Sequence, residues 1–313
     1  MLAVIGAIAI VLVAIVVRSA IDEDGGDSSS DDAADDGRLV IVCARDLATA
    51  CEVLTGATVI EEDAATTASQ IGSGSPPDGA DAWLTTSAWT EVVEARAPGA
   101  IDEVAALAAT PVVVAVDPAR AEAVTALCGD VALWRCLGDA TGNDWGALGG
   151  DARWGALRVG LPSASSATGL GVLAAAASGY FGGTDFASND FDSTPFRGWL
   201  DTLTAPSGAG EREPVATLIT ARGRYTAVGD LAASALDRRV AVLASEPGIE
   251  VNAVLAAFPG SEALDTDSPT AVALRELLVD RGWEARAGGD VPATLQVPGV
   301  LAALHSLWAD VTR

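Results

Sequence analysis

The chain from residue 38 onward alternates short apolar runs with longer alanine-rich runs. A continuous apolar run of about four to eight residues is typical of a buried strand, and apolar positions that recur every three or four residues indicate a helix. On this basis strands are predicted at 38–43, 58–61, 81–85, 109–116, 156–161, 239–243 and 252–258. Helices are predicted at 46–54, 64–71, 87–96, 170–180, 196–203, 214–221, 269–281 and 298–311.

Repeated strand–helix units of this kind predict the α/β fold class, with a mostly parallel sheet covered by helices on both faces. Asp46, Ser87 and Ser268 stand directly before predicted helices or open them, so they are candidate N-caps. Residues 117–153 are less regular and give no clear element.

The first seventeen residues, Met1 to Val17, form an unbroken apolar run. At about 1.5 Å per residue such a helix reaches ~25 Å, the lower limit for a membrane span. Residues 1–21 are therefore predicted to be a transmembrane anchor or a signal segment. A cleaved signal peptide needs a basic region before the run, and none is present, so we favour an uncleaved anchor over a cleaved signal. The missing basic region also fits a true start upstream of this Met.

Residues 22–37 are dominated by Asp, Ser and Gly, and they cannot bury enough apolar surface to order themselves. We expect this segment to be a disordered acidic stalk. It would carry the folded body, from residue 38, outside a cell membrane that the chain crosses once.

Four cysteines occur in two pairs with equal spacing, Cys43 with Cys51 and Cys128 with Cys136. We favour these two local disulfides because each pair lies within one supersecondary unit; free buried thiols are the alternative. The spacing is not that of a zinc site. Disulfides would agree with a body outside the cytoplasm.

The net charge of −25 and the residue counts exclude several function classes. Nucleic acid should be repelled. The chain has no lysine, so it has no Walker A phosphate loop and no Schiff-base chemistry. Acidic residues at 184–192 lack the spacing of a calcium loop, and no metal or cofactor is predicted. The acidity and the absence of lysine fit a high-salt habitat and GC-rich coding equally well.

Three predicted loops, 44–46, 85–87 and 163–168, each follow a strand and open a helix. In an open parallel sheet, ligands bind at the carboxyl ends of strands, near helix N-termini. Free N–H groups and the helix dipole favour anionic groups there, and Ser and Thr hydroxyls add donors. Plain capping explains any one of these loops as well. The three together favour a cleft for a small, anionic molecule.

The segment DWGALGGDARWGALRVGLPSASSATGL, residues 144–170, resembles bacterial extracellular solute-binding proteins with the type 2 periplasmic-binding fold. In these proteins a Trp-x-x-Leu segment precedes a strand, a Pro-Ser-rich turn and a helix of small residues. Further matching stretches are 179–182, 196–200 and 224–229. The resemblance extends over 38–313. It is strongest to actinobacterial membrane-anchored members that are related to molybdate-type binding proteins and that often accompany von Willebrand factor A domain proteins.

The resemblance implies two lobes joined by a hinge, with the ligand in the cleft between them. Lobe one would hold 38–116 and 240–313, and lobe two would hold 117–239. Ligand contacts in such proteins come from the loops after the first and third strands, from the Ser/Thr turn of lobe two and often from a late tyrosine. The matching residues here are Arg45, Asp46, Thr86, Ser87, Ser165, Ser166, Thr168 and Tyr225.

One departure from the molybdate-type pattern concerns the first of these loops. Molybdate binders usually carry small and hydroxyl residues after the first strand, whereas this chain has Cys-Ala-Arg-Asp at 43–46. Arg45 can pair with an oxyanion through two hydrogen bonds, but Asp46 beside it repels one.

The sequence thus predicts a membrane-tethered solute-binding protein, not an enzyme, that captures a small ligand, an oxyanion among the candidates, for an ABC transporter or another membrane protein. The alternative is a degenerate binding fold that acts as a scaffold or sensor ectodomain for a membrane partner. A hydrolase is disfavoured, because the single histidine, His305, lies in a helical run and the chain has no Gly-x-Ser-x-Gly elbow.

Overall fold

The computed structural model describes residues 38–261, 267–286 and 291–312. The predicted membrane segment and stalk, 1–37, lie outside the described residues. The strands of the described residues are β1 (Val40–Ala44), β2 (Thr58–Glu62), β3 (Ala82–Thr86), β4 (Glu103–Val116), β5 (Val159–Gly160), β6 (Ala227–Leu231), β7 (Ala241–Ala244), β8 (Glu250–Ala257) and β9 (Glu284–Ala285). In the described part of the chain, no helix has both the length and the apolar character that a membrane span requires.

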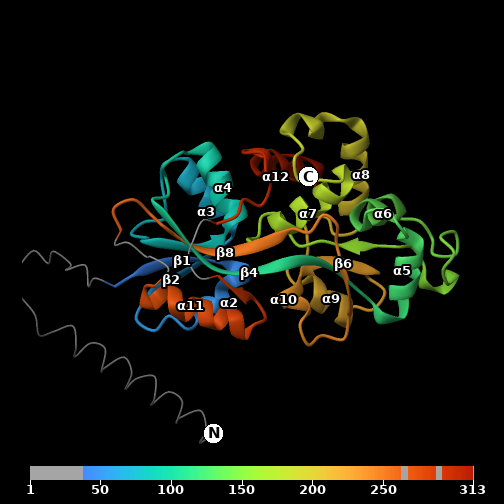
Figure 1. The fold of residues 1–313 in the computed structure, drawn as a ribbon, viewed down its shortest axis with the longest axis horizontal. Helices are drawn as coiled ribbons and strands as arrows, with labels where there is room; N and C mark the ends of the chain where they lie inside the picture. Colours follow the sequence, from blue (N-terminus) through green and yellow to red (C-terminus); the bar gives the residue numbers. More distant parts are fainter. Residues whose placement is uncertain (1–37, 262–266, 287–290, 313) are drawn as a thin grey trace, which may run out of the picture. The chain divides into compact units, whose positions relative to one another are not determined.

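The α-helices and 3₁₀ turns alternate with these strands (Figure 1). The α-helices are α2 (Ala48–Cys51), α3 (Ala64–Gly72), α4 (Ser87–Arg96), α5 (Ala121–Cys128), α6 (Leu133–Ala140), α7 (Gly169–Phe181), α8 (Thr194–Thr204), α9 (Pro214–Thr220), α10 (Ala232–Ala235), α11 (Pro269–Asp280) and α12 (Val300–Val311). The 3₁₀ turns are η1 (Arg45–Leu47), η2 (Pro118–Arg120), η3 (Ala152–Trp154) and η4 (Ser188–Asp192).

The strands form one continuous sheet in the order β2-β1-β3-β8-β4-β6-β5, with β7 and β9 also paired to β4. Strand β1 runs parallel to β2 and β3, and β5 runs parallel to β6. All pairings of β4 and β8 are antiparallel. The expectation of a mostly parallel sheet is therefore wrong. Strands β4 and β8 return along the sheet against the β-α units, which gives a mixed sheet.

Strand β4 divides the molecule into two lobes, because its first half pairs with β8 and its second half pairs with β6 and β7. We call β1, β2, β3, β8 and β9 with α2, α3, α4 and α11 the first lobe, and β5, β6 and β7 with α5 to α10 the second lobe (Figure 1). Helix α12 packs against helices of both lobes, α4 and α8 among them. The predicted lobe boundaries at 116 and 240 stay a prediction. They assign β7 and α12 to lobe one, whereas β7 pairs with the second half of β4 and α12 contacts helices of both lobes.

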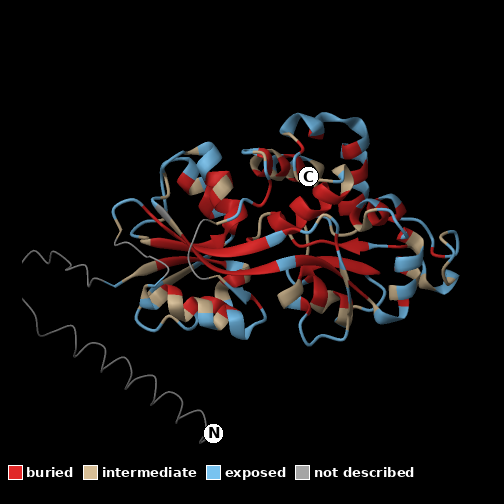
Figure 2. Cartoon of the chain, in the orientation of Figure 1, coloured by how far each residue is buried: buried red, intermediate tan, exposed pale blue. Residues whose placement is uncertain are grey.

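Buried side chains fill the space between the sheet and its helices in both lobes (Figure 2). Trp83 and Trp89 are fully buried in the first lobe, and Trp134 and Trp145 are fully buried in the second. The tryptophans that the sequence scatters along the chain are thus largely core residues. Residues 117–153, which showed no clear pattern, form α5 and α6, and the disulfide Cys128–Cys136 joins the two helices.

Two of the three predicted helix caps are wrong. Ser268 does accept a hydrogen bond from the backbone N–H of Ala271, at 3.2 Å, and so caps α11 as expected. Ser87 is the first residue of α4, and its hydroxyl instead lies 3.3 Å from that of Thr294. Asp46 caps a helix far along the chain rather than its own, as described below.

Candidate functional site

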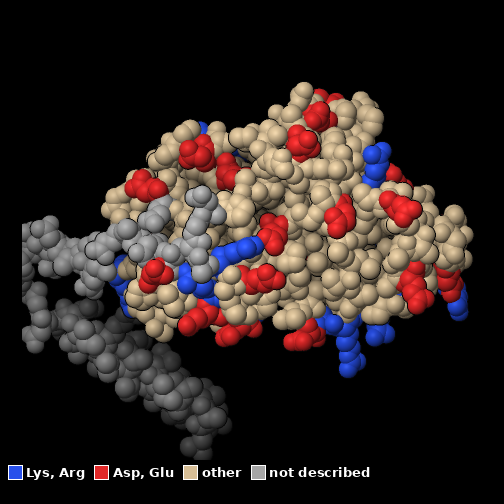
Figure 3. Space-filling model, viewed as in Figure 1, with Lys and Arg blue, Asp and Glu red and all other residues tan. Residues whose placement is uncertain are grey.

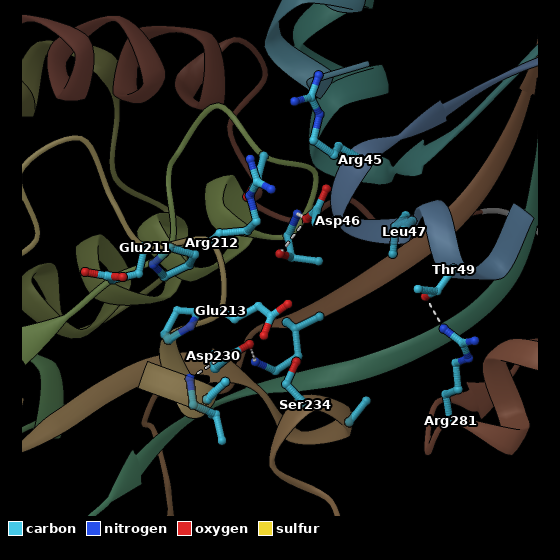
Figure 4. A pocket seen from close by; sticks show the side chains of 18 of the residues that line it. Arg45, Asp46, Leu47, Thr49, Glu211, Arg212, Glu213, Asp230, Ser234 and Arg281 are labelled. Atoms are coloured by element: carbon cyan, nitrogen blue, oxygen red, sulfur yellow. Dashed lines mark hydrogen bonds between the residues drawn. The ribbon is translucent and has the colours of Figure 1, made fainter. Parts of the chain in front are cut away.

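A cleft of about 940 Å³ lies between the two lobes, on the side of the sheet where the β1–α2 loop meets α7 and α10 (Figure 4). The first lobe contributes the stretch from Arg45 to Ala50 and the end of α11. The second lobe contributes the turn before α7, the segment 209–216 and residues 230–238. Charged side chains of both signs line it, so the cleft suits a polar molecule.

A short loop that is closed by a disulfide forms part of the first-lobe wall of the cleft. Strand β1 ends at Ala44, and only one 3₁₀ turn, η1, and the single-turn helix α2 follow it. Helices this short are not stable by themselves. Cys43 and Cys51 are buried and joined by a disulfide that encloses the whole loop. Both predicted disulfide pairings are thus confirmed, and the first of them holds cleft residues in place.

Asp46 extends from this loop to the beginning of α7. Its carboxylate accepts hydrogen bonds from the backbone N–H of Ala167 at 3.0 Å and from that of Thr168 at 2.8 Å. The Thr168 hydroxyl donates a third bond at 2.7 Å. Asp46 makes no side-chain bond that caps η1 or α2. The N–H groups that we expected to meet an anionic ligand are therefore bonded to a carboxylate of the protein itself.

The turn before α7, residues 163–168, is held by internal bonds as well. The Ser166 hydroxyl donates to the Ser163 carbonyl at 2.8 Å and accepts from the Gly169 N–H at 3.0 Å. The Ser163 hydroxyl accepts from the Ser165 N–H at 3.3 Å. Most polar groups of this turn are satisfied within the protein, so they are poor candidates for the main ligand contacts.

Five of the eight predicted ligand residues line the cleft: Arg45, Asp46, Ser165, Ser166 and Thr168. The other three, Thr86, Ser87 and Tyr225, are buried and are not among the lining residues. The Thr86 hydroxyl donates to the carbonyl of Ala167 at 2.6 Å. The Tyr225 hydroxyl donates to Glu211 at 2.5 Å, and this bond helps to hold the opposite cleft wall. These three residues act beside the cleft and not within it.

The second-lobe wall of the cleft was not predicted from the sequence. Glu211, Arg212 and Glu213 lie on it, and Figure 4 shows them across the cleft from Arg45 and Asp46. Glu211 is bonded to Tyr225 and forms an ion pair with Arg224. The signal that was available is the run Gly-Glu-Arg-Glu-Pro at 210–214, in which three charges stand between a breaker and a helix start.

Asp230 is a buried carboxylate in the floor of the cleft, at 7% exposure. It accepts hydrogen bonds from the N–H of Leu231 at 2.8 Å and from that of Val215 at 3.4 Å. Burial raises the pKa of Asp230 to about 6, these hydrogen bonds oppose the rise, and the nearby charge of Asp46 adds to it. The ionised carboxylate of Asp230 is therefore destabilised in the folded protein at neutral pH.

Asp230→Asn is expected to remove a pH dependence of stability between about pH 4 and pH 6. The folded-state pKa lies above the ordinary value of 3.8, so ionisation disfavours folding as the pH rises through this range. At 1.36 kcal/mol per pKa unit the wild type loses about 3 kcal/mol from this group by pH 7. Urea unfolding of both proteins at several pH values measures the difference. Asp237→Asn, at an exposed cleft residue, is the control, and equal slopes in Asp230→Asn and the wild type would contradict the assignment.

His305 does not line the cleft, and the described residues form no metal centre there. Within the described ranges, no group of three or more His, Cys, Asp or Glu side chains is placed to hold a metal ion. His305 packs edge-on against Trp89, with ring centroids 5.0 Å apart. Burial, with a contribution from Arg96, lowers the pKa of His305 to about 4, so the ring is neutral at pH 7.

Comparisons with known proteins identify the fold. No family model matches the sequence, and no curated protein does. Among solved structures, the periplasmic binding protein AfuA from Actinobacillus pleuropneumoniae, with exogenous fructose-6-phosphate bound, matches with a TM-score of 0.51 and 13% identity, over 88% of this chain and 96% of AfuA. Iron-bound HitA from Pseudomonas aeruginosa has a TM-score of 0.49 and 14% identity, over 87% and 98%. A periplasmic thiamin binding protein has a TM-score of 0.48 and 12% identity, over 88% and 96%.

At these identities the likeness shows the fold alone. The body of this chain has the two-lobed α/β fold of periplasmic solute-binding proteins, and the predicted fold class is confirmed at that level. AfuA and the thiamin binding protein are periplasmic binding proteins, and HitA was solved with iron bound.

Proposed function

We propose that this chain is an extracytoplasmic solute-binding protein that holds a small polar solute between its two lobes and serves a membrane transporter. The observation that carries the proposal is the cleft of about 940 Å³, lined by charged groups from both lobes. Ligand pockets of proteins have volumes of about 300–1,000 Å³. The fold of AfuA, which was solved with a sugar phosphate, supports the same reading.

The solute is proposed to carry an anionic group that contacts the arginines of the second-lobe wall. Arg212 and Arg238 line the cleft and are exposed, and neither forms an ion pair with another described residue. Arg45, on the opposite wall, pairs with Asp63 at 3.5 Å, where both side chains are about half exposed. A guanidinium forms paired hydrogen bonds with carboxylate or phosphate oxygens. Asp46 already occupies the start of α7, so we place the anionic group nearer Arg212.

A membrane-tethered location outside the cytoplasm forms part of this proposal. Its support is the apolar run from Met1 to Val17 and the two disulfides, which persist in oxidising compartments. Asp and Glu side chains are scattered over the visible face (Figure 3), in line with a chain that has 43 acidic and 18 basic residues. The association with von Willebrand factor A domain proteins stays a prediction from resemblance.

Thermal unfolding of the full chain with a panel of sulfate, molybdate, phosphate, sugar phosphates, sugars, amino acids and thiamin tests the proposal. One solute class should give a saturable rise in melting temperature, since a ligand at 100 times its Kd stabilises by about 2.7 kcal/mol. Arg212→Ala should weaken that binding by about tenfold or more, as expected for a lost charge-assisted bond.

Arg222→Ala is the matched control, because Arg222 is exposed in the same lobe and does not line the cleft. Equal affinities of the Arg212→Ala variant and the wild type would remove the anion assignment. A folded sample that no solute class stabilises would overturn solute binding itself.

A non-transport scaffold or sensor ectodomain is the second candidate. The observation that favours it is the turn at 165–168, because backbone groups of this turn are bonded to residues of the first lobe. Its partner would be a neighbouring membrane protein. A failure of every solute in the panel would favour this candidate.

A further inference from the structure

The turn before α7 is bonded to the first lobe at four separate places. Asp46 of η1 binds the N–H groups of Ala167 and Thr168. The N–H of Ala65, in α3, donates to the Ser165 carbonyl at 3.0 Å. The Thr86 hydroxyl, in β3, donates to the Ala167 carbonyl at 2.6 Å. The indole N–H of Trp89, in α4, donates to the Ser166 carbonyl at 2.8 Å.

Asp46 makes the strongest of these connections for three reasons. Its single carboxylate accepts three hydrogen bonds, at 2.7 to 3.0 Å. Hydrogen bonds to an ionised group are roughly twice as strong as those between neutral groups. The carboxylate also lies at the N-terminus of α7, a helix of 13 residues, where the helix dipole favours a negative charge.

The other rim of the cleft has a much weaker contact. There the Leu236 side chain, at the end of α10, packs against Gly282, just after α11. Leu236 remains 51% exposed, so little apolar surface is buried by this contact. Of the contacts described at the two rims, those at the turn before α7 are therefore the more extensive.

We propose that Asp46 is an interlobe latch that holds the two lobes together at the cleft. A change from closed to open separates the lobes about the strands that connect them, as in hinged binding proteins. Separation at this rim must break the bonds of Asp46 to Ala167 and Thr168. The proposal rests on the two-lobed fold and on these bonds, and it holds whether or not the proposed solute binds.

Spin-label distances in the full chain without any solute test the latch. Glu276→Cys on α11 and Thr220→Cys on α9 place one label on each lobe at exposed positions. The four native cysteines are all in disulfides, so only the introduced cysteines react. Asp46→Ala is expected to lengthen the mean distance by more than about 2 Å, the scale of domain rearrangements, and to broaden its distribution.

Asp63→Ala is the matched control. Asp63 is a carboxylate of the same wall of the cleft, but its ion pair is with Arg45 of its own lobe. The latch predicts an unchanged distance in this variant. Equal lengthening in Asp63→Ala and Asp46→Ala would show that loss of charge, and not the bond to α7, opens the cleft, and it would overturn the proposal.

An unchanged distance in folded Asp46→Ala would overturn it as well. If that variant does not fold, Asp46→Asn preserves the shape but has only one acceptor oxygen, and Thr168→Val removes only the hydroxyl bond. Each should give a smaller lengthening in the same direction, and no lengthening in either folded variant would refute the latch. Since no solute is present, these outcomes are independent of the solute panel.

Discussion

Gly169→Ala is expected to destabilise the protein by about 3 kcal/mol, the upper part of the usual range for an added core methyl group. Gly169 is the first residue of α7 and is buried. A Cβ at this position would overlap the carbonyl group of Ser163 and would lie 2.8 Å from the Ser166 hydroxyl. The first of these is a backbone group, so the overlap can be relieved only by moving the turn that Asp46 contacts.

Urea unfolding of the variant measures this loss, with Gly198→Ala as the control. Gly198 is exposed in the middle of α8, and nothing lies within 4 Å of a Cβ built there. Its replacement should instead stabilise by about 0.5–1 kcal/mol, because alanine is the better helix former. A Gly169→Ala variant as stable as the wild type would mean that the turn can move freely, and the geometry described for the cleft rim would not hold.

Replacing both Cys43 and Cys51 with alanine is expected to lower stability by about 2–3 kcal/mol, from the entropy that the closed loop removes from the unfolded chain. A further effect should follow from the location of the loop. It carries Arg45, Asp46 and Thr49, which line the cleft, on helical segments of three and four residues. Without the disulfide these residues lose their fixed positions, so both solute affinity and the spin-label distance should change.

The second disulfide is a control with equal spacing. Cys128–Cys136 also joins residues eight apart, but it links α5 to α6 and does not line the cleft. Its double alanine variant should lose a similar amount of stability in urea unfolding and should keep the spin-label distance of the wild type. If the two double variants behaved alike in both measurements, the first disulfide would have no special role at the cleft.

The hydrophobic pattern predicted most elements of the first lobe closely. The predicted strand at 58–61 corresponds to β2, and the predicted helix at 64–71 corresponds to α3. Local periodicity is sufficient there because each element buries one continuous apolar face. It was insufficient at β6, Ala227–Leu231, where a glycine and the buried Asp230 interrupt the apolar run. Strand direction was not predictable either, because the antiparallel pairings of β4 and β8 join residues that are distant in sequence.

The candidate site was predicted in part. Positions after strands identified Arg45, Asp46 and the Ser/Thr turn as cleft residues, because the ends of neighbouring strands meet at one edge of a sheet. Thr86 and Tyr225 were predicted to contact the ligand, but they do not line the cleft, and their hydroxyls donate to Ala167 and Glu211. The wall at 209–213 precedes the predicted helix at 214–221 but follows no predicted strand, so its position at the cleft depends on tertiary packing.

The sequence by itself predicted the α/β class, the two local disulfide pairs and a polar loop after the first strand. These features depend on composition and on neighbours within about ten residues. Only the tertiary structure decided what Asp46 contacts. Next to its own helix the residue had the pattern of an N-cap, yet its carboxylate meets N–H groups 121 and 122 residues away. An unpaired helix N-terminus attracts whichever anion the fold brings to it, and that depends on the packing of the two lobes.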